Sequence, residues 1–233
     1  ANFNPRVRSL VEVYADDFRL ENLTLHNTTA KGGSQAESLR VRADRCVLDH
    51  CDFSSLQDTL QLTGRVYVNE CFVEGDVDFV WGSGTVYFNR CELKTLNNGY
   101  LVQSRNGAGR LGYIFADCQL TATPNVTRYI LARIEPGRFP SSHVAFLNCA
   151  MAPIYGGVGW QFDQGPNAAG PLPATDKIQF QEFQSTTLEG KPFDVSARHP
   201  ASKQLTAAEA AKLRDVAQVL GGADRWDPTA APR

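Results

Sequence analysis

The sequence contains no long hydrophobic run: no stretch approaches the roughly 18 consecutive apolar residues that a membrane-spanning helix requires. It also lacks an excess of charge, because its 233 residues carry a formal net charge of −2, without the basic surface that nucleic acid or an anionic membrane demands. Its first ten residues, ANFNPRVRSL, lack the apolar core of a signal peptide. We therefore expect no nucleic acid and no membrane as partner, and an exported form would already have lost its leader.

Metal-binding patterns are also missing. The sequence has no Cys-x-x-Cys spacing, and its four histidines, His26, His50, His143 and His199, form no cluster. Structural zinc sites need cysteine and histidine ligands at short, regular spacings. The sequence therefore predicts a protein without a metal ion.

What the sequence does contain is an eight-residue pattern repeated six times. Apolar residues occupy its first, third, sixth and eighth places, usually with a polar or kinked pair between them, which is typical of two short strands joined by a bend. Most copies start 20 to about 30 residues apart, the spacing of stacked coils with occasional longer loops. The pattern predicts a parallel β-helix. The copies are FRLENLTL (18–25), CVLDHCDF (46–53), VYVNECFV (66–73), VYFNRCEL (86–93), YIFADCQL (113–120) and VAFLNCAM (144–151).

The sixth place of this pattern holds most of the cysteines. In a coiled stack it becomes one interior column, and Cys46 falls in another inward column. Buried cysteine behaves as a small apolar residue, so the placement favours free thiols over a disulfide framework. An oxidised pair on adjacent coils is the alternative. The column consists of Leu23, Cys51, Cys71, Cys91, Cys118 and Cys149.

Two aspartates share one phase of the predicted coil. Asp58 follows Cys51 by seven residues, and Asp78 follows Cys71 by the same number. If the cysteines are stacked, the two carboxyl groups lie on neighbouring coils about 4.8 Å apart. Carboxylates so close do not both ionise, so one keeps its proton while the other stays an anion, the state needed for an acid and a nucleophile or base. A structural pair of turn aspartates is the alternative.

Other side chains near these aspartates in sequence suit the same chemistry. Phe79 and Trp81 offer aromatic faces on which sugars stack. The amide groups of Gln35 and Gln57 can donate to a developing oxyanion. Arg133 can hold a carboxylate through a forked pair of hydrogen bonds. The alternatives are core packing for the aromatic rings and a solvated surface position for the arginine.

The motifs QAESLRV, LQDTL, GDVDFVWG and LARIE, in that order, resemble those of the pectin methylesterases, a family of right-handed parallel β-helix carbohydrate esterases. The resemblance implies that Asp78 is the nucleophile and Asp58 the general acid and then base. It further implies an oxyanion hole from Gln35 and Gln57, an arginine at Arg133 that bonds the nucleophile, and no cofactor. The implied substrate is the methyl ester of galacturonate units in pectin.

Sugar contacts are expected to differ from the family pattern in one motif. The family motif reads like Leu-Gly-Arg-Pro-Trp, whereas this sequence has Leu131 to Glu135 there, with an acid in place of the tryptophan. Glu135 would repel de-esterified polygalacturonate, which favours a methylated stretch or a different ester. The looser resemblance of GVGWQF (157–162) adds Trp160 as a substrate-binding candidate. Loop arginines that could line a cleft for an acidic polysaccharide, or simply be solvated, are Arg105, Arg110, Arg128 and Arg138.

The domain organisation follows from these patterns. We expect a single pectinesterase-like β-helix domain over residues 1–233, with coils over about 10–160 and a wrapping tail and helix over 161–233. A capping box at Thr206 and Glu209 and a stop at Gly221 predict a helix over 206–220, with Leu213, Ala217 and Leu220 on its packed face. Because the chain begins almost at a coil, we expect N-terminal coils and a cap to be missing.

The sequence therefore predicts an all-β, right-handed parallel β-helix that removes methyl esters from pectin or a related polysaccharide, acting as a secreted or periplasmic monomer. Two alternatives stay open. The same scaffold could hydrolyse another ester or thioester, or it could bind polysaccharide without catalysis. Methanol release from methylated pectin separates these functions.

Overall fold

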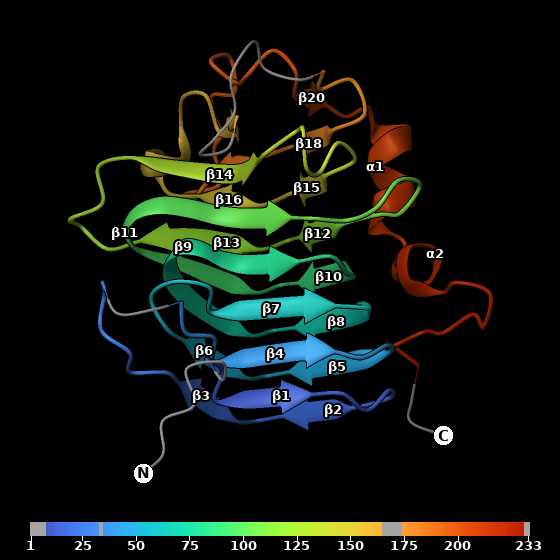
Figure 1. Cartoon of the computed structure of the whole chain (residues 1–233). Coiled ribbons are helices and arrows are strands. Elements are labelled where there is room, and N and C mark those ends of the chain that lie inside the picture. Colours follow the sequence, from blue (N-terminus) through green and yellow to red (C-terminus); the bar gives the residue numbers. More distant parts are fainter. Residues whose placement is uncertain (1–7, 33–34, 165–173, 231–233) are drawn as a thin grey trace.

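The chain is described by a computed structural model that covers residues 8–32, 35–164 and 174–230. Its strands form one 12-stranded and one 8-stranded sheet, and every strand pairing between named strands is parallel. The coils stack from the blue N-terminal strands to the orange C-terminal strands (Figure 1). This is the parallel β-helix that the repeat predicts.

Three faces make up each coil. The β1 face contains β1 (Val11–Val13), β4 (Leu39–Arg42), β7 (Leu60–Thr63), the second halves of β9 (Phe72–Gly82) and β11 (Glu92–Ser104), β14 (Tyr129–Ile134) and β17 (Trp160–Phe162). The β2 face contains β2 (Arg19–Glu21), β5 (Cys46–Asp49), β8 (Arg65–Asn69), β10 (Thr85–Asn89), β12 (Tyr113–Ala116), β15 (His143–Leu147), β18 (Gln179–Phe183) and β20 (Lys203–Gln204).

The third face, the β3 face, contains β3 (Thr24–His26), β6 (Asp52–Ser54), the first halves of β9 and β11, β13 (Gln119–Ala122), β16 (Ala150–Met151) and β19 (Thr186–Thr187). β9 and β11 therefore run from the β3 face into the β1 face of the following coil. This continuity explains why the two faces form one sheet.

The bend within each repeat is a single residue in the left-handed conformation. The fifth place of all six copies has a φ between 48° and 55°, which turns the chain from the β2 face to the β3 face. The strand–bend–strand interpretation of the repeat is confirmed. The bend residues are Asn22, His50, Glu70, Arg90, Asp117 and Asn148.

The interior is built from ladders of like side chains. Phe115 stacks between Phe88 and Phe146, with ring centroids 4.5 and 4.7 Å apart. All six cysteines are buried free thiols, as the column predicts. Leu23, the first member of that column, is an exception: its side chain is 45% exposed, because no strand of the described residues covers the open side of the first coil.

A seventh coil follows the six that the pattern identified. Residues 161–205, expected to be an extended tail, instead include β18 and β19, which continue the sheets. The eight-residue pattern is hidden in this coil because Glu182 occupies a place that is apolar in the other copies. Its Oε1 pairs with Arg198 at 2.6 Å, and its Oε2 accepts a hydrogen bond from Ser185. A buried acid is tolerated there because its charge is neutralised. A short 3-10 helix (Pro153–Tyr155) precedes this coil.

The C-terminal helix is broken. The capping box of Thr206 and Glu209 is confirmed, but the expected helix over 206–220 divides into α1 (Ala207–Arg214) and α2 (Val216–Leu220). Asp215 leaves the helical conformation and its carboxylate caps α2 through the amide of Gln218. The break also changes the packed face, so Ala217 is exposed. Both helices lie along one side of the stack (Figure 1), and their buried side chains, Ala210, Val219 and Leu220, pack against the β2 face.

Within the residues that the structure describes, no helix has the length and apolar character needed to cross a bilayer.

Candidate active site

Asp58 and Asp78 lie opposite one another on neighbouring coils of the β1 face. Leu60 of β7 pairs with Val80 of β9, and Gln57 bridges to Val77. The residues before and after the two aspartates therefore pair in one register, which places Asp58 opposite Asp78. The amide of Asp58 donates to the carbonyl of Val77 at 3.0 Å. The stacking inferred from the cysteine spacing is therefore present.

Both aspartates adopt a backbone conformation that is uncommon for residues other than glycine. The φ angle is 66° at Asp58 and 48° at Asp78. Aspartate tolerates this left-handed region better than most residues, and such conformations concentrate at functional sites. The two residues are also only 6% and 5% exposed, so their carboxyl groups are largely removed from water.

The surroundings of Asp58 favour its neutral form. Burial, then the negative charges of Asp78 and Glu37, raise the pKa of Asp58 to about 7, while Arg8 and Arg105 act in the opposite direction. Desolvation and like charge both disfavour a carboxylate. Near neutral pH Asp58 therefore retains a proton in a substantial fraction of molecules.

Asp78 pairs with Arg133, which projects from β14. The guanidinium donates from Nε to Oδ1 at 2.9 Å and from Nη2 to Oδ2, a forked ion pair. The same guanidinium lies 4.2 Å from the ring centroid of Tyr100 and pairs with Asp163 at 3.6 Å. These contacts fix the arginine, so it can orient the carboxylate of Asp78.

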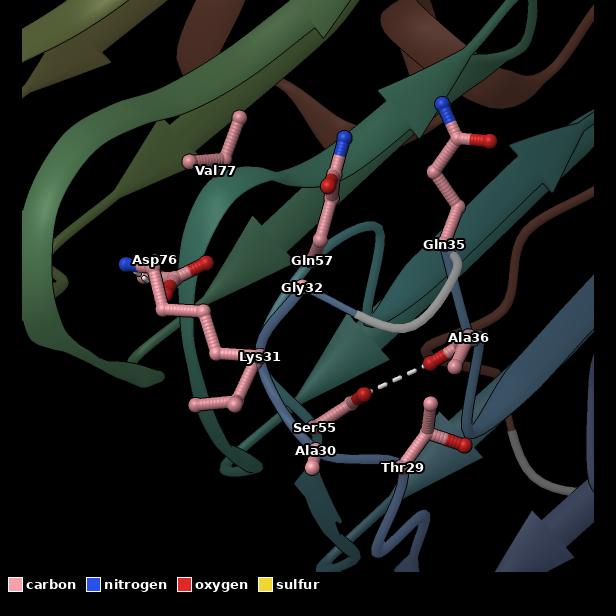
Figure 2. Close-up of a pocket in the computed structure, with 11 residues that line it drawn as sticks. Thr29, Ala30, Lys31, Gly32, Gln35, Ala36, Ser55, Gln57, Asp76 and Val77 are labelled. Atoms are coloured by element: carbon pink, nitrogen blue, oxygen red, sulfur yellow. Dashed lines mark hydrogen bonds and ion pairs between the residues drawn. The ribbon is translucent and has the colours of Figure 1, made fainter.

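Gln35 and Gln57 line a pocket of about 270 Å³ whose wall includes the residues just before the two aspartates, but not the aspartates themselves. Figure 2 shows their amide nitrogens directed to the same side, away from Ser55. Another wall contains Val77 and Lys31, whose Nζ lies 2.7 Å from the buried carboxylate of Asp76. Register and contacts thus join Asp58, Asp78 and Arg133, while the two amides line the pocket formed by the residues just before the aspartates.

Trp81 borders the site with one of the loop arginines. Its indole ring is partly exposed, and the guanidinium of Arg105 lies 4.6 Å from its centroid and 5.3 Å from that of Phe139. Arg105 also donates to Gln103 of β11. Burial lowers the pKa of Arg105, and the negative charges of Asp78 and Asp58 oppose that shift.

Two expected sugar contacts are wrong. Phe79 is 0% exposed and packs inward, because Asp78 and Phe79 alternate between the outer and inner sides of β9. Trp160 is 1% exposed and stacks on Phe180 in the core at 4.8 Å. Neither ring offers a face to a ligand.

Glu135 remains near the site but does not carry a free charge. Its carboxylate pairs with Arg138 at 3.1 Å, and it also acts electrostatically on Arg105. The repulsion of an acidic polysaccharide expected from Glu135 is therefore reduced. Of the other loop arginines, Arg110 and Arg128 are exposed.

Sequence reasoning missed two charged residues at the site. Arg8 lies 3.7 Å from Asp58, and Glu37 is a buried acid beside the same aspartate. Glu37 had a signal, since it stands two residues after Gln35 within the QAESLRV motif. Arg8 had none, because its contacts with Gln35, Glu37 and Asp58 join residues far apart in the sequence.

Comparisons with known protein sequences give matches to one family. The family model described as Pectinesterase matches residues 7–172. Pectinesterase 31 of Arabidopsis thaliana is 39% identical over 114 residues, 48% of this chain and 36% of the relative. Probable pectinesterase A of Aspergillus fumigatus is 30% identical over 217 residues, 91% of this chain and 60% of the relative. The chain thus spans about a third to three fifths of the length of these two relatives.

Solved structures show the same fold. The pectin methylesterase from carrot superimposes with a TM-score of 0.80 at 20% identity, covering 96% of this chain and 71% of the other. A pectin methylesterase solved in complex with a hexasaccharide superimposes with a TM-score of 0.74 at 24% identity, covering 96% and 75%.

Proposed function

This chain belongs to the pectinesterase family, and from that premise we propose that it hydrolyses the methyl esters of galacturonate units in pectin. The observation that carries the proposal is the in-register pair of Asp58 and Asp78, of which one has a raised pKa and the other is held by an arginine. An acid and an anion side by side are the two groups that acyl transfer through a carboxylate nucleophile requires.

In the proposed first half-reaction, a carboxylate oxygen of Asp78 attacks the ester carbonyl carbon. Gln35 and Gln57 donate amide hydrogens to the oxyanion that develops on the carbonyl oxygen. Asp58 gives its proton to the leaving methoxide, so methanol departs and an acyl anhydride with Asp78 remains. Arg133 keeps the attacking carboxylate oriented.

In the second half-reaction, Asp58 is ionised and removes a proton from water. The resulting hydroxide attacks the acyl carbon of the anhydride, and Asp78 leaves as a carboxylate. The products are the galacturonic acid unit, a protonated Asp58 and an anionic Asp78, so the cycle returns to its starting state. No step needs a group that the chain does not supply.

Methanol release tests this function. The purified chain is incubated with highly methylated pectin and with de-esterified polygalacturonate, and methanol is measured over time. We expect methanol and matching acid from the first substrate and none from the second. Retention on pectin without methanol would instead support a binding protein, and hydrolysis confined to small acetyl or thioesters would support a different esterase.

The pH dependence follows from Asp58. Because the reaction begins with Asp58 protonated and its pKa is raised to about 7, kcat/KM is expected to fall above this pH, by about tenfold per unit well above it. Initial rates from pH 5 to 9, corrected for the alkaline hydrolysis of pectin itself, measure this limb. A rate that keeps rising to pH 9 would contradict the acid role.

We further propose that the protein works where polymeric pectin is accessible, outside the cytoplasm. A polymer cannot be reached from inside an intact cell. Fractionation of the native host tests this point, and recovery of the protein only in the cytoplasm would contradict it.

A further inference from the structure

Glu37 is a fully buried acid whose contacts are one-sided. Its side chain is 0% exposed, and Oε1 accepts from Nη2 of Arg8 at 2.6 Å, with Nε of Arg40 3.8 Å away. Its other oxygen, Oε2, has no hydrogen-bond partner among the described residues. A buried carboxylate oxygen without a partner costs free energy, so a purely structural role is a poor explanation for this residue.

Glu37 occupies the same phase of the coil as the two aspartates. The pairing of Leu39 with Leu60 continues backwards, because Ser38 donates to the carbonyl of Thr59 and Ala36 to that of Gln57. Glu37 therefore lies opposite Asp58. Three carboxyl groups, from Glu37, Asp58 and Asp78, thus follow one another on successive coils of the β1 face.

Arg8 connects this third acid to the rest of the site. Its Nη2 contacts both Glu37 and, at 3.7 Å, Oδ2 of Asp58. Its Nη1 donates to the side-chain oxygen Oε1 of Gln35. The side-chain nitrogen of Gln35 points to the same side as that of Gln57 (Figure 2), where it can donate to a ligand. Arg8 therefore contacts two acids, Glu37 and Asp58, and the side-chain amide of Gln35.

We propose that Glu37 is a positioning residue that binds and neutralises Arg8, so that Arg8 can orient Gln35 without drawing the proton from Asp58. The inference rests on the proposed function, because it assigns Asp58 the role of the acid. An unpaired arginine 3.7 Å from Asp58 would stabilise the carboxylate form, and the acid would then be ionised when substrate binds.

The other charged residues near Glu37 and Asp58 have different partners or lie closer to Asp58. Asp78 on β9 and Arg105 after β11 act on Asp58 from the opposite side and do not contact Glu37. Arg40 on β4 is already paired with Glu12 at 2.9 Å and with Gln61, so it compensates Glu37 only weakly. Arg8 is therefore the cation that Glu37 neutralises.

The test is the alkaline limb of the kcat/KM profile for methanol release. In Glu37→Gln, the loss of the negative charge leaves Arg8 uncompensated, and the limb is expected to move to lower pH by about one unit. In Arg8→Met the cation is gone, and the limb is expected to move to higher pH. The double variant is expected to return it close to the wild-type position.

Matched controls separate this effect from general charge or folding effects. Glu92→Gln makes the same substitution on the β3 face, where Glu92 accepts from Thr121, and should leave the limb unmoved. Thermal unfolding of each variant reports whether it folds. If Glu37→Gln does not fold, Arg8→Met still tests the inference, because without the cation the charge of Glu37 is uncompensated opposite Asp58 and should move the limb to higher pH. An unmoved limb in a folded Arg8→Met variant would overturn the inference.

Failure of this inference is distinguishable from failure of the proposed function. The role of Glu37 alone would be overturned if the wild type releases methanol and its alkaline limb lies at the same pH as those of Glu37→Gln, Arg8→Met and the double variant. If the wild type releases no methanol, ¹³C NMR titration of the Asp58 carboxyl carbon replaces the rate. Opposite shifts in Glu37→Gln and Arg8→Met would then support the inference, and the absence of shifts would overturn it.

Discussion

Replacing Asp78 by Asn is expected to abolish methanol release, with a loss of about 10⁴-fold or more in kcat. The amide is almost the same shape as the carboxylate, but it cannot attack an ester carbonyl. Without the covalent step the remaining groups only bind and polarise the ester. Methanol assays on highly methylated pectin, with detection sensitive enough for a slow residual rate, measure the loss.

The control for Asp78→Asn must show that the fold survives. Arg133 loses a charged partner but keeps the amide oxygen as an acceptor and retains Asp163 and Tyr100. Some loss of stability is expected, because breaking a buried ion pair is costly. Asp52→Asn makes the same substitution at an exposed position of β6 and should keep wild-type turnover. Near-normal activity in Asp78→Asn would refute the nucleophile.

Replacing Asp58 by Asn is expected to reduce kcat/KM for pectin by about 10²- to 10⁴-fold, the usual contribution of a general acid or base. Asparagine neither gives a proton to methoxide nor takes one from water. The variant should also lose the alkaline limb near pH 7, because the group that titrates there has been removed. Rates across pH 5 to 9 measure both effects.

The leaving group separates this role from a structural one. An aryl ester, whose phenolate departs without a proton, should show a smaller acylation defect in Asp58→Asn than pectin does. Rapid-mixing measurements of the first turnover isolate that step from the water-dependent second step. An equal defect on both substrates in the first turnover would contradict proton delivery by Asp58.

Much of the fold was readable because its repeat is short and local. The bend at His50 or Glu70 and the apolar places around it are set by neighbours in sequence, so each copy predicts its own two strands. The seventh coil escaped because its inward Glu182 is compatible with burial only through Arg198, sixteen residues further on. The break at Asp215 escaped because an N-cap within a helical stretch looks like an ordinary polar helix residue.

For the candidate site, the sequence by itself determined the register of Asp58 and Asp78, since equal distances from stacked cysteines place two side chains at one phase of a coil. Only the tertiary structure decided what surrounds them. The burial of Phe79 and Trp160, the stacking of Arg105 on Trp81 and the crossing of Arg8 between Glu37 and Asp58 depend on which segments fold across the coils. Register is a property of periodic spacing along the chain, whereas burial and charge compensation depend on contacts between residues far apart in sequence.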